Sequence, residues 1–176
     1  FEIGVTLVAA LLWSKMAQDS GRGVSVGMGA GAFEAILIGA LSVLGVLAAL
    51  TMGGQIREQL LASAAPAAET TPLFWLVGPV ERVTAILCHT SSRALVLLGV
   101  ARRRWLWPFL AGFLIMTILD AVAGYAHLAG LMGEVSVWWI ELAIAPAGLV
   151  SIPLLVWCIR EWPEASAVSA VENAHP

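Results

Sequence analysis

Residues 81–96, ERVTAILCHTSSRALV, decide what kind of fold this chain can adopt. The stretch is apolar enough to cross a lipid bilayer, yet it carries four ionisable side chains, Glu81, Arg82, His89 and Arg93. An ionisable group that faces lipid at the bilayer centre costs about 2.5–3.5 kcal/mol. These residues therefore need partners inside the protein, which predicts that one face of this segment lines a polar interior.

The chain as a whole has the composition of a membrane protein. Of its 176 residues, 60% are hydrophobic and 12% are charged, whereas a soluble domain is about half apolar and about a quarter charged. Its apolar runs each approach the roughly 20 residues that cross a bilayer as a helix. The net charge is only −3, and no basic patch alternates with aromatic residues, so nucleic acid is not an expected partner. We predict an all-α fold, a polytopic transmembrane helical bundle of about five spans.

The spans are expected at Phe1–Met16, Val24–Met52, Leu73–Val100, Trp107–Met132 and Val135–Trp162. Because the chain begins inside an apolar run and without Met, we expect an N-terminal truncation that removes earlier helices. Residues 53–71, GGQIREQLLASAAPAAETT, are too polar to span and predict a short interfacial helix followed by a loop. Residues 1–162 would then form the bundle, and residues 163–176 a polar cytoplasmic tail.

Positive residues in short loops predict the orientation. They gather between the first two spans, between the third and fourth spans and after the last span, at Lys15, Arg22, Arg102, Arg103, Arg104 and Arg160. We therefore expect these loops and the C-terminus in the cytoplasm of a bacterial-type plasma membrane. The tryptophans, which were not used to set this orientation, then form two interfacial belts. The inner belt holds Trp13, Trp105, Trp107, Trp157 and Trp162, and the outer belt Trp75, Trp138 and Trp139.

Depth along each span groups the buried polar residues into two layers. At about 1.5 Å per residue from the cytoplasmic side, the first layer lies near mid-bilayer and holds Glu2, Glu34, His89 and Asp120. The second layer lies near the outer surface and holds Glu81, Arg82, His127 and Glu141. We expect Glu81 and Arg82 to form an ion pair, Glu141 to be wetted at the interface, and Arg93 to extend toward the cytoplasmic headgroups.

Small residues explain how helices could close around such a site. Gly27, Gly31, Ala35 and Gly39 form a ladder at four-residue intervals, a pattern that lets a second helix approach closely. Glu34 lies beside this ladder and is therefore expected at a helix–helix seam. Cys88 and Cys158 both lie in apolar runs and are expected to be buried small hydrophobes rather than a disulfide or metal pair.

Two longer motifs and two shorter ones resemble a known family. Residues 81–96 contain Glu81-Arg82-x-x-Ala85-x-x-x-His89, followed by Ser92 and Leu95-Val96. Residues 27–37, GMGAGAFEAIL, resemble the pattern Gly-x-Gly-His-Gly-x-x-Glu-Ala-Ile-Leu. Phe1-Glu2 resembles part of a Phe-Glu-Glu motif, and Asp120 the acid of a His-x-x-x-Asp motif. Together they resemble the YhfC-type family of intramembrane metalloproteases, which is distantly similar to CAAX-prenyl endopeptidases.

The resemblance implies a membrane-embedded, metal-dependent peptidase that uses a divalent metal, zinc if the site is active. It implies His89 and Asp120 as metal ligands, with Glu2 as a possible third, and Glu34 and Glu81 as catalytic carboxylates. Membrane lipid and a peptide or membrane-protein substrate are the implied partners, while the oligomeric state stays open. Two motif histidines are replaced, by Ala30 and Met116. A non-catalytic scaffold or binder of the same fold therefore remains an alternative, as does a small-solute or proton-coupled transporter, for which buried acids also serve.

Overall fold

The computed structural model describes residues 1–52 and 54–163, and in this part of the chain every regular element is a helix. In chain order these are α1 (Glu2–Leu12), η1 (Ser14–Ala17), α2 (Ser20–Met52), α3 (Gly54–Thr70), α4 (Phe74–Ala101), α5 (Leu106–Leu128), η2 (Leu131–Gly133) and α6 (Val137–Arg160). The predicted tail after Pro163 lies outside the described residues. The prediction of an all-α transmembrane bundle is confirmed.

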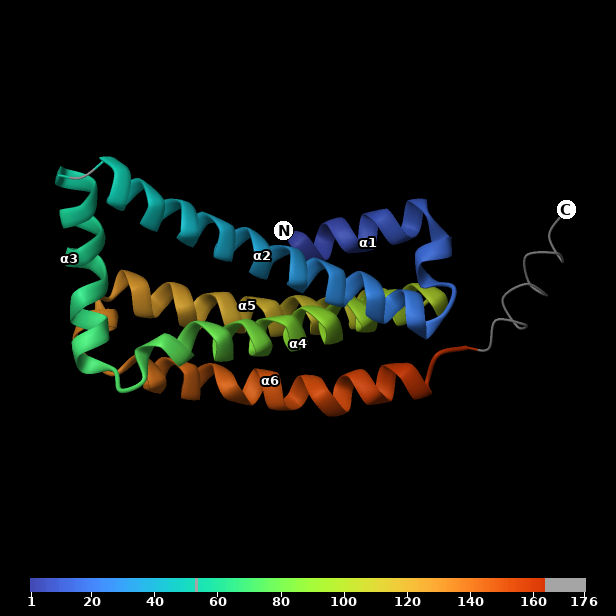
Figure 1. Cartoon of the computed structure of the whole chain (residues 1–176). Coiled ribbons are helices and arrows are strands. Elements are labelled where there is room, and N and C mark those ends of the chain that lie inside the picture. The colour runs from blue at the N-terminus through green and yellow to red at the C-terminus, as the bar shows by residue number, and fades with distance from the viewer. Residues whose placement is uncertain (53, 164–176) are drawn as a thin grey trace, which may run out of the picture.

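Four of the described helices, α2, α4, α5 and α6, are long and apolar enough to cross a membrane. They run lengthwise side by side, and α3 lies across one end of the bundle (Figure 1). The fifth apolar helix, α1, has 11 residues and is too short to cross alone. It is shorter than the predicted span because the helix ends at Leu12 and a 3₁₀ turn follows. As a result, Phe1 lies about halfway along the bundle (Figure 1).

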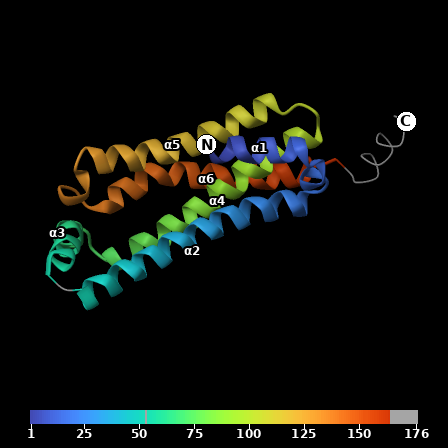
Figure 2. The same ribbon diagram turned by 90° about the horizontal axis from the view of Figure 1, so that it is seen from above.

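Helix α4 is the centre of the bundle and packs against α1, α2, α5 and α6. Seen from above, it lies between α2 on one side and α5 and α6 on the other (Figure 2). Every residue from Cys88 to Gly99 is buried, including the polar ones. Because α4 is enclosed over this stretch, a side chain between Cys88 and Gly99 must meet another helix and cannot reach lipid.

Two glycines of α2 allow the closest helix approach to this part of α4. A Cβ atom placed on Gly27 would lie 2.6 Å from Thr90 Cα, and one placed on Gly31 would lie 3.0 Å from Ile86 Cα. The expected small-residue contact is therefore present at these two positions, while a Cβ on Gly39 would meet no described atom within 4 Å. The seam at Gly27 and Gly31 brings the backbone of α2 beside His89.

Helix α3 differs from the loop expected for the second half of residues 53–71. It continues through Pro66 to Thr70. Alanine, the best helix former, dominates residues 62–68 and offsets the backbone hydrogen bond that Pro66 removes. Ala67 also packs into an apolar cluster with Val137 and Ile140 of α6, so tertiary contact stabilises this end of the helix. The prediction that residues 53–71 lie at the membrane interface stays a prediction.

Candidate metal centre

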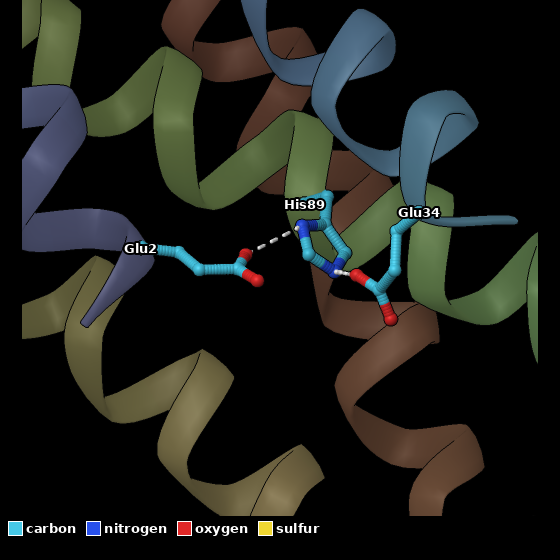
Figure 3. Close-up of side chains that lie close together, drawn as sticks. All are labelled: Glu2, Glu34 and His89. Carbon is cyan, nitrogen blue, oxygen red and sulfur yellow. Dashed lines mark ion pairs between the residues drawn. The ribbon is translucent and has the colours of Figure 1, made fainter. Parts of the chain in front are cut away.

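His89 lies at the middle of α4, roughly 18 Å along the helix from Ala101 at about 1.5 Å per residue. Its side chain is nearly inaccessible, with a residue exposure of 2%. Its Nε2 lies 2.7 Å from Oε2 of Glu34 on α2, and its Nδ1 lies 3.6 Å from Oε2 of Glu2 on α1. Figure 3 shows the imidazole between the two carboxylates. Three helices thus contribute one ionisable side chain each to a single cluster.

Two arginines of α4 flank this cluster, one for each glutamate. Arg93 Nη1 lies 2.6 Å from His89 Nδ1, and its Nη2 donates to Glu2 Oε2 at 2.6 Å. Arg82 Nη1 donates to Glu34 Oε1 at 3.4 Å, and Arg82 also forms the expected ion pair with Glu81. The expectation that Arg93 extends toward the headgroups is wrong, because its guanidinium binds Glu2 and His89 and the residue is buried.

A cavity of about 290 Å³ opens beside the cluster. It is lined by residues of α1, α2, α4 and α5, namely Phe1, Glu2, Ile3, Glu34, His89, Phe113, Met116, Thr117 and Asp120. One wall is therefore polar, and α5 supplies an apolar wall at Phe113 and Met116. Asp120, an exposed residue of α5, lines the same space as Glu2, Glu34 and His89.

The donor set fits a divalent cation. Glu2, Glu34 and His89 each offer one ligand atom, and these atoms lie within 4.8 Å of one another. An imidazole with two carboxylates suits zinc as well as harder divalent metals. Glu2, Glu34 and Glu81 pair with the guanidiniums of Arg82 and Arg93, and Asp120 adds a fourth carboxylate to the cavity lining. Acidic side chains thus outnumber the two arginines at this site.

The structure brings together most of the residues that the sequence singled out. Glu34 and His89 are in direct contact, and Asp120 lines the same cavity. Glu81 is not among the residues that line this cavity and reaches Glu34 through Arg82. Spacing could have found the place of Arg93, because residues four apart on a helix share a face. Thr117 and Phe113 carried no signal, since such residues are common in apolar helices.

Two residues of the predicted outer layer behave differently from one another. Glu141 is buried on α6, with an exposure of 8%, so the expectation of a wetted carboxylate is wrong. The first turns of α6 are covered by the α3–α4 connection, where Val137 N donates to Thr71 Oγ1, and the charged neighbours of Glu141 are Glu81 and Arg82. His127 is exposed on α5 and lies outside the set that lines the cavity. Cys88 and Cys158 are free and buried, as expected.

Comparison with known proteins adds independent information. Residues 1–142 match the family described as YhfC intramembrane metalloprotease. The uncharacterized membrane protein YhfC of Bacillus subtilis (strain 168) is 28% identical over 143 residues, a match that covers 69% of this chain and 55% of the relative. The chain thus spans about half the length of this curated relative. No solved structure matches. Together with the four long apolar helices, the family match identifies an integral membrane protein.

Proposed function

The chain belongs to the YhfC intramembrane metalloprotease family, and we propose that it is a membrane-embedded peptidase whose metal is held by Glu2, Glu34 and His89. The proposal rests on one observation, that three helices present these three donors within 4.8 Å of one another beside a cavity. Catalytic zinc commonly takes three protein ligands and keeps one position open, so zinc is the metal we propose. A bound zinc would act as a Lewis acid toward the peptide carbonyl and would activate water.

The protein's own residues would orient the reacting groups and move protons. Asp120 lines the same cavity as Glu2, Glu34 and His89 but is not one of the three proposed ligands. We therefore assign it the role of general base, which takes a proton from the attacking water and passes it to the leaving amine. Glu34 moves from the role of base to that of ligand, because its carboxylate offers a donor atom within 4.8 Å of those of Glu2 and His89. Glu81 acts through Arg82, which it holds against Glu34. Relative to the roles implied by the sequence, His89 remains a ligand, Glu34 becomes a ligand and Asp120 becomes the general base.

The cavity dimensions favour an extended peptide as the substrate. At about 290 Å³ the space is at the small end of ligand sites, which measure about 300–1,000 Å³, and a helix about 10 Å across would not enter. The scissile segment of a membrane protein would therefore have to unwind locally. Phe113 and Met116 supply an apolar wall for a side chain of that segment.

A non-catalytic scaffold is the second candidate, and Met116 favours it. In the family motif a histidine stands where this chain has Met116, and Met116 lines the cavity, where a second imidazole would be available to a metal. Ala30, which lies one helical turn before Glu34, replaces the other motif histidine. If the double variant Ala30→His/Met116→His gains metal binding or proteolysis that the native protein lacks, the native protein is a non-catalytic scaffold.

Metal content of the purified protein is the direct test of the peptidase. We expect close to one equivalent of zinc by elemental analysis, and its loss in His89→Ala. His127→Ala is the matched control, because it removes an exposed histidine from α5 and should leave the metal in place. A protein that purifies without metal, and whose thermal stability does not respond to a chelator, would exclude this function. Uptake of a solute into vesicles that needs no metal and is abolished by Glu34→Gln would establish a transporter instead.

The orientation is tested separately. The distribution of positive residues predicts that the C-terminus faces the cytoplasm. A reporter enzyme that is active only in the cytoplasm should therefore be active when it is fused after Pro176.

A further inference from the structure

We propose that Arg93 is a latch on the metal site, and that a divalent cation must displace it to reach His89 and Glu2. The inference rests on the proposed metal site and adds a residue that works against metal binding. Arg93 is the group in closest contact with both of these donors, at 2.6 Å from His89 Nδ1 and 2.6 Å from Glu2 Oε2. It is also 4% exposed, so the contact is enclosed by the bundle.

The hydrogen bonds define which ring nitrogen of His89 carries the proton. A guanidinium can only donate, so the bond from Arg93 requires that Nδ1 accept and therefore carry no hydrogen. Nε2 lies 2.7 Å from a carboxylate oxygen of Glu34, an acceptor, so Nε2 must carry the hydrogen. Neither nitrogen then offers a free lone pair, because that of Nδ1 is used by Arg93 and Nε2 is protonated. In this arrangement His89 cannot ligate a metal.

Release of Arg93 would free both donors without any gain or loss of protons. The lone pair of Nδ1 would become available, and Glu2 Oε2 lies 3.6 Å from that nitrogen. A divalent cation in the place of the guanidinium would therefore meet both donors at once.

Charge leads to the same conclusion. The guanidinium of Arg93 places a positive charge where a divalent cation would meet Glu2 and His89, and two cations cannot share the same donors at close range. Arg82 provides an internal comparison, since it belongs to the same helix and carries the same charge. It contacts Glu34 at 3.4 Å, and it donates to the carboxylates of Glu34 and Glu81 rather than to the imidazole. Removal of Arg82 therefore changes the charge but leaves the bond to Nδ1 intact.

The test compares Co²⁺ binding to the native protein and to three variants in detergent micelles, followed by visible absorption. Arg93→Gln, which removes the competing positive charge, should bind Co²⁺ at least about tenfold more tightly, as expected when a charged hydrogen bond no longer competes. Arg93→Lys keeps a donating cation and should remain near the native affinity. Arg82→Gln should gain clearly less than Arg93→Gln.

The ¹⁵N spectrum of labelled histidine gives a second readout that does not depend on the variants. The native protein, freed of metal by a chelator, should show His89 protonated at Nε2, with the signal assigned by its loss in His89→Gln. An Nδ1-protonated ring, or an Arg93→Gln variant that binds Co²⁺ no more tightly than the native protein, would overturn the latch while leaving the metal site in place. If no variant binds Co²⁺ through His89, both the latch and the proposed function fail.

Discussion

Helices α2 and α4 are both long apolar helices, yet they relate to their surroundings in opposite ways. In the most apolar stretch of α2 only 6% of residues are buried inside the protein, whereas the corresponding share in α4 is 72%. The helix with four ionisable residues in its middle is the buried one, and the helix with a single acid, Glu34, in its central part lies at the edge. This is the reverse of the order found in a water-soluble protein, where the more polar helix lies outside.

The difference follows from the solvent. Lipid tails are as apolar as leucine, so the hydrophobic effect gives no reason to bury α2. A charged side chain loses several kcal/mol when it faces lipid, so the polar face of α4 is forced inward. What holds α2 against α4 is therefore close backbone contact at small residues together with the polar contacts of Glu34. Fold and candidate site depend on the same short seam.

The most damaging change to this seam is Gly27→Val. The added Cβ would lie 2.6 Å from Thr90 Cα, and a backbone atom cannot yield as a flexible side chain can. We expect α2 to separate from α4, with a loss of more than about 3 kcal/mol and loss of the contact between Glu34 and His89. Unfolding by SDS in mixed micelles measures the first effect, and metal binding the second.

Gly29→Val is the matched control for that experiment. It adds the same side chain two residues later on α2, where a Cβ would meet no described atom within 4 Å. We expect stability and metal binding close to those of the native protein. Equal damage from both substitutions would mean that helix propensity, and not the approach to α4, determines the effect.

Hydropathy was sufficient to predict the four long helices, because each span must satisfy its own backbone in lipid, but it did not predict the early end of α1 or the second half of α3. The position of His89 beside Glu34 also followed, since the charge penalty leaves so few alternatives. Arg93 was misplaced because the snorkelling argument ignored its position four residues after His89, which puts both side chains on one face. Its other partner, Glu2, comes from 91 residues earlier in the chain, and a long-range pairing of this kind leaves no trace in the periodicity of either helix.

A buried side chain of α4 should contribute less to the free energy of unfolding than one in a water-soluble protein, but clearly more than an exposed side chain of α2. Leu97 is fully buried and packs with Ala10 and Ala17. We expect Leu97→Ala to cost about 2–3 kcal/mol, in the lower part of the range for buried leucines, because the unfolded reference state also lies in an apolar medium. Leu44→Ala on α2, where the side chain is 60% exposed, should cost almost nothing. Similar losses at the two sites, measured by SDS unfolding, would contradict the difference between the helices.

The smallest expected effect concerns the polar contact between α4 and α6. Ser91 Oγ donates to Ser151 Oγ at 2.9 Å, both groups are buried, and Ser151 also donates to Ala147 O at 2.8 Å. Ser91→Ala should cost only about 0.6 kcal/mol, the average for hydrogen bonds between membrane helices, since Ser151 keeps its second partner. Ser42→Ala on α2 removes an exposed hydroxyl that bonds within its own helix and should be neutral. A loss above about 2 kcal/mol at Ser91 would mean that hydroxyl contacts, rather than close packing and the charged cluster, hold α4 in place.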